Sequence, residues 1–278
     1  MLGKLIKNEF KSTAHSMFGV FLAGGAIFVI MLIVFLFKIK SLMVISSVAL
    51  GGIALAVLFI TLFSIISMFN KSLYGAQGYL SFTLPVTGKQ LLAGKTIVSL
   101  LWVAISFIFA VFVVAFLVVY WVAQTSDNVK QVIQSIYDML QNMQGMPDPQ
   151  TAIKVLVAIV AALFVKALFM IFKVAFSLAI ANTRPFQGHN AIFMAILIYA
   201  AIFIVLTLGT AVGAQIPVYV SIASSGVGLT VNEALIGLPE GTSIFLDLPI
   251  LGYIFEAIVC VLLYVATGNI MTNHINIK

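Results

Sequence analysis

The sequence predicts an all-α integral membrane protein with six transmembrane helices. The chain has 278 residues, of which 63% are hydrophobic and only 8% are charged. A water-soluble domain carries about 25% charged residues, so most of this surface must face lipid. Several apolar runs reach about 20 residues, the length that crosses a bilayer as an α-helix. The strict alternation typical of barrel strands is missing. The runs are expected to form one domain over residues 1–278.

Residues 1–16 precede the first apolar run and have two chemically different sides. Apolar residues recur at helical spacing, with lysines around the rest of the circumference: Leu2, Leu5, Ile6 and Phe10 against Lys4, Lys7 and Lys11. This pattern predicts an amphipathic interfacial helix that leads into the first span. A basic anchor without further structure would lie at the same membrane surface.

The apolar runs predict the positions of the six spans. Polar or turn-forming residues separate successive runs, and each run is long enough to cross the hydrocarbon core. After the third run, residues 126–144 carry apolar side chains three and four positions apart, which predicts an external amphipathic helix. The predicted spans are residues 17–37, 42–68, 96–121, 152–181, 191–214 and 249–271.

Residues 78–95, between the second and third spans, are rich in turn-forming residues. Pro85 pushes the residue before it out of the helical region of backbone conformation. Thr87 and Gln90 have the spacing of a capping box, so a helix is expected to start at Gly88. The segment is too short to cross the bilayer. It is therefore expected to form a helix-turn-helix on the membrane surface.

Gly94, Lys95 and Thr96 look like the end of a phosphate-binding loop, but the rest of that motif is absent. The earlier glycine of the motif would fall where the chain has Lys89. No hydrophobic strand precedes the segment, and a membrane span follows it. Nucleotide binding is therefore not expected on this chain.

Residues 215–248, between the fifth and sixth spans, are expected to contain a short helix. Thr230 and Glu233 have capping-box spacing before an apolar Ala-Leu-Ile sequence. The apolar character of the segment suggests a re-entrant element that dips back toward the membrane. A plain external loop accounts for the same composition.

The basic residues favour an orientation with both termini in the cytoplasm. The net charge of +6 is spread along the chain and is typical of membrane topology and lipid contact, not of nucleic-acid binding. In this orientation the inner segments hold Lys4, Lys7, Lys11, Lys71, Lys89, Lys95, Arg184 and Lys278, and the outer ones hold Lys38, Lys40, Lys130 and Lys154. Residues 78–95 are then expected to face the cytoplasm.

Three ionisable residues inside the predicted spans are candidates for a translocation path: Lys166, Lys173 and Glu256. The two lysines are seven positions apart and therefore share one face of the fourth span. A charge in the bilayer is costly unless it is paired or hydrated, so this face is expected to meet protein or water. Snorkelling of Lys173 to the inner surface is the alternative, and pairing of Lys166 with Glu256 is a further hypothesis.

No pattern of catalytic or metal-binding residues stands out. The histidines His15, His189 and His274 are isolated, and the single cysteine, Cys260, lies in an apolar run. No zinc-protease motif is present. The chain is therefore not expected to be an enzyme, nor to hold a metal or cofactor itself.

Two stretches carry a resemblance to a known family. Residues 1–13 (MLGKLIKNEFKST) and 78–92 (GYLSFTLPVTGKQLL), together with Lys95 and Trp102, resemble permease subunits of type-2 ABC transporters from Gram-positive bacteria. The layout of six spans is similar as well. Where such permeases often carry an acidic residue before Gly-Tyr-Leu, this chain has Ala76 and Gln77.

The resemblance implies a multi-pass exporter subunit in a bacterial cell membrane. In such exporters the cytoplasmic loop between spans two and three holds a coupling helix that rests on a separate ATPase. Two ATPase chains would then supply ATP and Mg²⁺, and a second permease chain, identical or homologous, would complete the path. The segment between spans five and six would form a re-entrant pair of helices. The implied ATPase-coupling residues are Tyr79, Leu80, Phe82, Leu84, Pro85, Thr87, Lys89, Gln90 and Leu91.

Two other functions agree with the same residues. A permease fold with the external helix at 126–144 would also serve bacteriocin immunity or antimicrobial-peptide sensing. A stand-alone ion-coupled carrier would use Lys166 and Glu256, although the internal repeats common in carriers are not evident.

Overall fold

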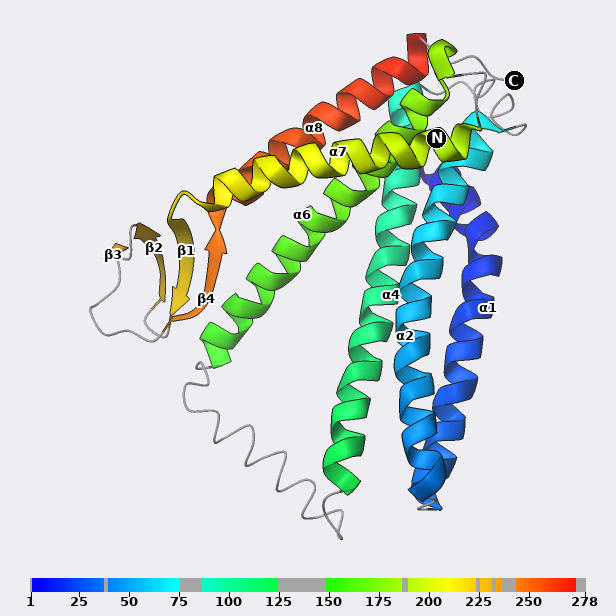
Figure 1. Cartoon of the computed structure of the whole chain (residues 1–278), viewed down its shortest axis with the longest axis vertical. Helices are drawn as coiled ribbons and strands as arrows, with labels where there is room; N and C mark the ends of the chain where they lie inside the picture. Colours follow the sequence, from blue (N-terminus) through cyan, green and yellow to red (C-terminus); the bar gives the residue numbers. More distant parts are fainter. Residues whose placement is uncertain are drawn as a thin grey trace. The chain divides into compact units, whose positions relative to one another are not determined.

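The fold is known from a computed structural model (Figure 1). The structure describes residues 2–37, 40–75, 87–124, 149–186, 190–223, 226–231, 234–236 and 244–273. Two regions lie outside these residues. They are the predicted external helix at 126–144, and residues 76–86, which include the first part of the segment with the predicted ATPase-coupling residues. The chain divides into two compact units, one of Met1–Val86 and Gln90–Asn142, the other of Thr87–Lys89 and Met143–Lys278.

Six helices in the described ranges are long and apolar enough to cross a membrane, as predicted for a six-span helical membrane protein. They extend beyond the predicted spans at several ends. The cap at Thr87 predicted the start of α4 at Gly88 correctly. The helices are α1 (Leu2–Leu36), α2 (Lys40–Phe69), α4 (Gly88–Gln124), α6 (Pro149–Ala181), α7 (Ala191–Ala214) and α8 (Ile250–Asn273), with short helices η1 (Asn70–Tyr74) and η2 (Arg184–Phe186).

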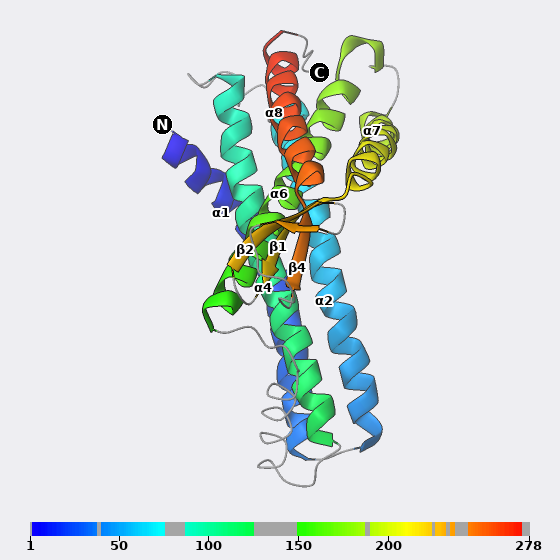
Figure 2. The same cartoon turned by 90° about the vertical axis from the view of Figure 1, so that its left-hand side faces the viewer.

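The first unit is built from α1, α2 with its π-helical extension η1, and α4. Figures 1 and 2 show the three long helices running alongside one another. Their shared core contains Met31, Val34, Leu50, Ala54 and Val113. Many other apolar side chains on these helices are exposed, as lipid-facing helices require.

Residues 2–16 continue into the first span as part of one helix, α1. Figure 2 shows the N-terminal turns of α1 angled away from the rest of that helix. The amphipathic pattern therefore predicted a helix correctly, and its place on the membrane surface stays a prediction. The first turns of α1 pack on the start of α4. Leu5 lies so close to Gly94 that a Cβ atom at Gly94 would come within 2.3 Å of the Leu5 side chain.

A buried hydrogen bond connects α2 with α4. The hydroxyl oxygens of Thr61 and Ser106 are 2.6 Å apart, and the Thr61 hydroxyl is also 2.7 Å from the carbonyl oxygen of Val57 in its own helix. Replacing Ser106 by alanine is expected to lower the free energy of unfolding by about 0.6 kcal/mol, and by at most about 1.7 kcal/mol, as for other interhelical bonds in membranes. The loss is small because Thr61 keeps its intrahelical acceptor.

Ser99→Ala is the matched control for Ser106→Ala, and detergent unfolding curves measure both variants. Ser99 lies on α4 as well, and its buried hydroxyl has no hydrogen-bond partner among the described residues. Its removal is therefore expected to cost nothing. Equal losses for the two variants would mean that the bond between α2 and α4 contributes no stability.

The second unit is built from α6, α7 and α8, together with a small sheet. Its helical core contains Phe169, Phe172, Cys260 and Leu263. Gly209 of α7 lets the ring of Phe255 approach closely, since a Cβ atom there would lie 2.9 Å from that ring. The chain forms η2 after α6, and α7 is capped by Asn190, whose side chain accepts a hydrogen bond from the amide of Ile192.

The segment between α7 and α8 is a four-stranded antiparallel sheet, so the predicted short helix and the re-entrant helix pair are wrong. The strands are β1 (Val218–Ala223), β2 (Gly226–Val231), β3 (Ala234–Ile236) and β4 (Ile244–Pro249), in the order β3-β2-β1-β4. Pro249, the predicted first residue of the sixth span, instead ends β4, which leads straight into α8 (Figure 1).

Local features of the sequence favour strands in this segment. β1 is rich in β-branched and aromatic residues, which favour strands. In β2, Val227, Leu229 and Val231 alternate with Gly228 and Thr230, so the alternation of a strand is present but short. Gly226 opens β2 with a φ of 149°, a conformation that glycine adopts without strain. Pairing of Ala234 with Val231 then extends the sheet where the capping pattern predicted a helix.

Candidate functional site

Four of the nine predicted coupling residues lie in the described part of the chain, at the start of α4. Thr87, Lys89 and Gln90 are exposed there, whereas Leu91 is 2% exposed and packs inside the chain. The other five, Tyr79, Leu80, Phe82, Leu84 and Pro85, lie outside the described residues. A charged substitution at Leu91 would therefore disturb packing before it reported on any partner.

The first turn of α4 is held by α8. Gly88 and Lys89 group with the second unit. The Tyr264 hydroxyl donates a hydrogen bond to the Lys89 carbonyl oxygen at 3.0 Å. The stem of Lys89 also lies over Gly268, where a Cβ atom would come within 2.8 Å of it. The point at which the connecting segment enters α4 is therefore a packed contact and not a loose turn.

Lys95 joins three segments of the first unit. Its side chain is 0% exposed, and its Nζ atom donates to Glu9 Oε1 of α1 and to Ser72 Oγ of η1, each at 2.5 Å. Ser72 in turn donates to the carbonyl oxygen of Met68. A buried ammonium requires such partners, because its desolvation is otherwise uncompensated.

Sequence reasoning used Lys95 as a cytoplasmic charge and missed its partners. One signal was present, since Glu9 is the only acidic residue before Asp127. A lone carboxylate in a lysine-rich helix suggests a specific partner. Its separation of 86 residues from Lys95 left that partner unidentified.

Trp102 packs beside this cluster on the next turns of α4. Its indole ring stacks on Phe10 with centroids 4.8 Å apart and an interplanar angle of 4°. The indole N–H donates to the Thr13 hydroxyl at 2.9 Å, and that hydroxyl lies 3.0 Å from the carbonyl oxygen of Glu9. α1 and α4 are thus joined by a charge pair, a hydrogen bond and a ring stack within a few turns.

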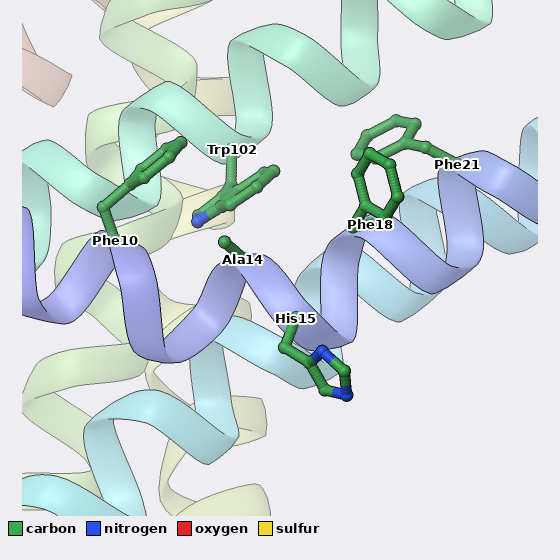
Figure 3. A pocket seen from close by; sticks show the side chains of 6 residues that line it. All are labelled: Phe10, Ala14, His15, Phe18, Phe21 and Trp102. Carbon is green, nitrogen blue, oxygen red and sulfur yellow. The ribbon is translucent and has the colours of Figure 1, made fainter.

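An apolar pocket of about 470 Å³ lies between the same two helices (Figure 3). Apart from His15, its lining is apolar, and Figure 3 shows the His15 ring directed away from Trp102. The lining residues are Phe10, Ala14, His15, Phe18, Phe21 and Trp102. This lining is suited to hydrophobic contact and offers no pair of groups for acid–base chemistry.

The three charged residues predicted inside the membrane lie together in the second unit. Lys166 of α6 donates to Glu256 Oε1 of α8, so the structure contains the hypothesised pair. Glu256 is 3% exposed, and its second oxygen, Oε2, is buried with no hydrogen-bond partner among the described residues. The Lys166 side chain is 52% exposed, and its ammonium lies 5.1 Å from the ring centre of Tyr253.

Lys173 lies in a cage of three aromatic rings. Its Nζ atom is 4.3 Å from the ring centre of Phe169, 5.1 Å from that of Phe203 and 5.9 Å from that of Tyr199. The residue is 7% exposed, so its ammonium stays inside the unit and does not snorkel out of it. Aromatic faces attract cations but accept no conventional hydrogen bond. Among the described residues, no carboxylate or carbonyl oxygen accepts a hydrogen bond from Lys173.

A polar set on the sheet holds three strands together. Ser221 of β1 donates to Asp247 Oδ1 of β4 at 2.5 Å, and its hydroxyl also shares a hydrogen bond with Thr230 of β2. Ser221 is fully buried. No histidine stands beside this set in the described ranges, which also contain no group of three metal-binding side chains. Its chemistry is that of a cross-strand hydrogen bond and not of a nucleophile.

Comparisons with protein-family models, with curated proteins and with solved structures find no match to this chain.

Proposed function

We propose that this chain is the membrane permease subunit of an ATP-driven exporter of amphipathic or hydrophobic substrates. In this proposal it lies in a bacterial cell membrane with both termini in the cytoplasm. Two separate ATPase chains and a second permease chain, identical or homologous, complete the transporter. The segment between α2 and α4 couples this chain to the ATPase.

The observation that carries the proposal is the anchoring of that segment. The segment begins after η1, where Ser72 binds Lys95, and it ends at Gly88, about two turns before Lys95 on α4. Glu9 adds α1 to the same cluster. Lys95 is fully buried, and removing one partner of such an ion pair is costly. A force on the segment would therefore move α1, η1 and α4 together. A flexible attachment would absorb that force instead.

ATPase coupling is expected to depend on Leu84. In the complex purified in mild detergent from cells that naturally make it, Leu84→Asp should abolish association with the ATPase and its stimulation by the permease. Loss of a central apolar contact at an interface costs about 2 kcal/mol or more of binding free energy. ATP hydrolysis and ATPase recovery, measured per mole of permease, give the readout.

Leu84→Met is the matched control, since it keeps an apolar side chain of similar volume and should retain coupling. The coupling proposal fails if Leu84→Asp leaves both ATPase recovery and ATP hydrolysis unchanged. The wider proposal fails if the unmodified chain brings no ATPase with it.

A second candidate function is a stand-alone ion-coupled carrier, which the buried Lys166–Glu256 pair favours. Carriers use paired intramembrane charges as relays that open and close with ion binding. The purified chain alone, in liposomes with a pH gradient, tests this directly. Substrate uptake that is lost in Glu256→Gln would select the carrier, and no uptake without ATPase would reject it.

A further inference from the structure

We propose that Lys166, Lys173 and Glu256 form a binding site for the head group of an amphipathic anion, a carboxylate or a phosphate ester on an alkyl tail. The identification of this ligand as transported cargo rests on the function proposed above. The binding itself does not, because it requires neither ATP nor a partner chain.

Charge balance is the first argument. The cluster contains two ammonium groups and one carboxylate, and Lys166 already occupies one oxygen of that carboxylate. Lys173 has aromatic rings as its near neighbours, and Glu256 attracts it without a hydrogen bond between them. An excess positive charge among apolar helices is costly unless an anion or water compensates it. One negative charge from a ligand would make the site neutral.

Hydrogen bonding is the second argument. An ammonium group has three donors and no acceptor, and ring faces satisfy its charge without accepting those donors. A carboxylate or phosphate oxygen would provide the missing acceptors. Charge-assisted bonds of this kind are about twice as strong as neutral ones.

Access is the third argument. The half-exposed Lys166 side chain lies near the middle of α6, where contact with hydrocarbon alone would be unfavourable. Charged residues at such depth face a water-filled cavity or other protein. Lys166 therefore marks the side from which a hydrated head group enters, and the exposed ring of Phe203 beside Lys173 offers apolar surface for the tail.

The same geometry opposes a cationic ligand. A cation would need a free carboxylate oxygen, but Glu256 Oε1 is bound by Lys166 and Oε2 is buried away from the surface. The accessible charge of the site is the Lys166 ammonium. The site therefore attracts anions and not cations.

Equilibrium binding of radiolabelled laurate to the full chain, purified in a neutral detergent, tests the inference. Lys173→Gln is expected to weaken binding about tenfold, the equivalent of one charge-assisted hydrogen bond of about 1.4 kcal/mol. Glu256→Gln is expected to tighten binding about threefold or more, because it removes the competing carboxylate. Misfolding would weaken binding in both variants, so opposite changes distinguish the site from damage.

Lys154→Gln is the matched control, since it removes an exposed lysine from the same helix outside the cluster. It should leave laurate binding unchanged. Dodecyl phosphate should displace the label, whereas dodecanol and dodecyltrimethylammonium should not. The relative strength of laurate and dodecyl phosphate identifies the preferred head group.

Two results would overturn the inference: equal binding by wild type and Lys173→Gln, or equal displacement by the cationic and anionic amphiphiles. Recovery of an ATPase with the chain is a separate measurement. Anion binding without an ATPase would reject only the permease function. An ATPase without anion binding would reject only this site.

Discussion

Lys95→Met is expected to lower the free energy of unfolding by about 3–5 kcal/mol, because it leaves the Glu9 carboxylate without its buried cation. The Lys95 side chain is fully buried, and it also supplies a hydrogen bond to Ser72. A long apolar side chain fills the space without replacing the charge. Unfolding of the purified chain, followed by circular dichroism during titration with a denaturing detergent, measures the loss.

The double variant Lys95→Met/Glu9→Gln is the control for this prediction. With both charges removed, no buried ion is left unpaired, so most of the stability should return. The single variant Glu9→Gln is measured as well. If the losses of Lys95→Met and Glu9→Gln simply add up to the loss of the double variant, the carboxylate and the ammonium do not interact. That result would also remove the mechanical basis of the coupling proposal.

Trp102→Ala is expected to destabilise the first unit by about 3–5 kcal/mol, the usual cost of deleting a large buried aromatic side chain. Trp102 is buried, stacks on Phe10 and lines the apolar pocket between α1 and α4. Its removal would enlarge that pocket and loosen the contact between α1 and α4. The midpoint of thermal unfolding in detergent gives the measurement.

Trp102→Phe separates the ring from its hydrogen bond. Phenylalanine keeps an aromatic face toward Phe10 but cannot donate to Thr13, so a loss of only about 1 kcal/mol is expected. Equal destabilisation by alanine and phenylalanine would mean that the indole N–H, and not ring packing, supports the contact.

Features that depend on a few neighbouring residues could be predicted from the sequence. The six long helices follow from the length of each apolar run, and the capping pattern of Thr87 and Gln90 predicted the start of α4 at Gly88. The heptad spacing of Lys166 and Lys173 likewise placed both on one face of α6. Their chemical environments could not be predicted, since the rings of Tyr199 and Tyr253 come from other helices.

The sheet shows where local reasoning failed. A capping pattern at Thr230 and Glu233 predicts a helix from four residues, whereas strand pairing depends on distant ones. Ser221 of β1 pairs with Asp247 of β4, 26 residues later. That pairing outweighed the local signal, because β-structure depends on cross-strand contacts more than on intrinsic preference.

The sequence by itself determined that the chain has six helices long and apolar enough to cross a membrane, because that property depends on composition and run length alone. Only the tertiary structure decided which charges pair: Lys95 with Glu9, and Lys166 with Glu256, with Lys173 left among aromatic rings. The paired residues are 86 and 90 positions apart. In an apolar medium a buried charge is costly without a partner, and helix packing determines which groups are within reach.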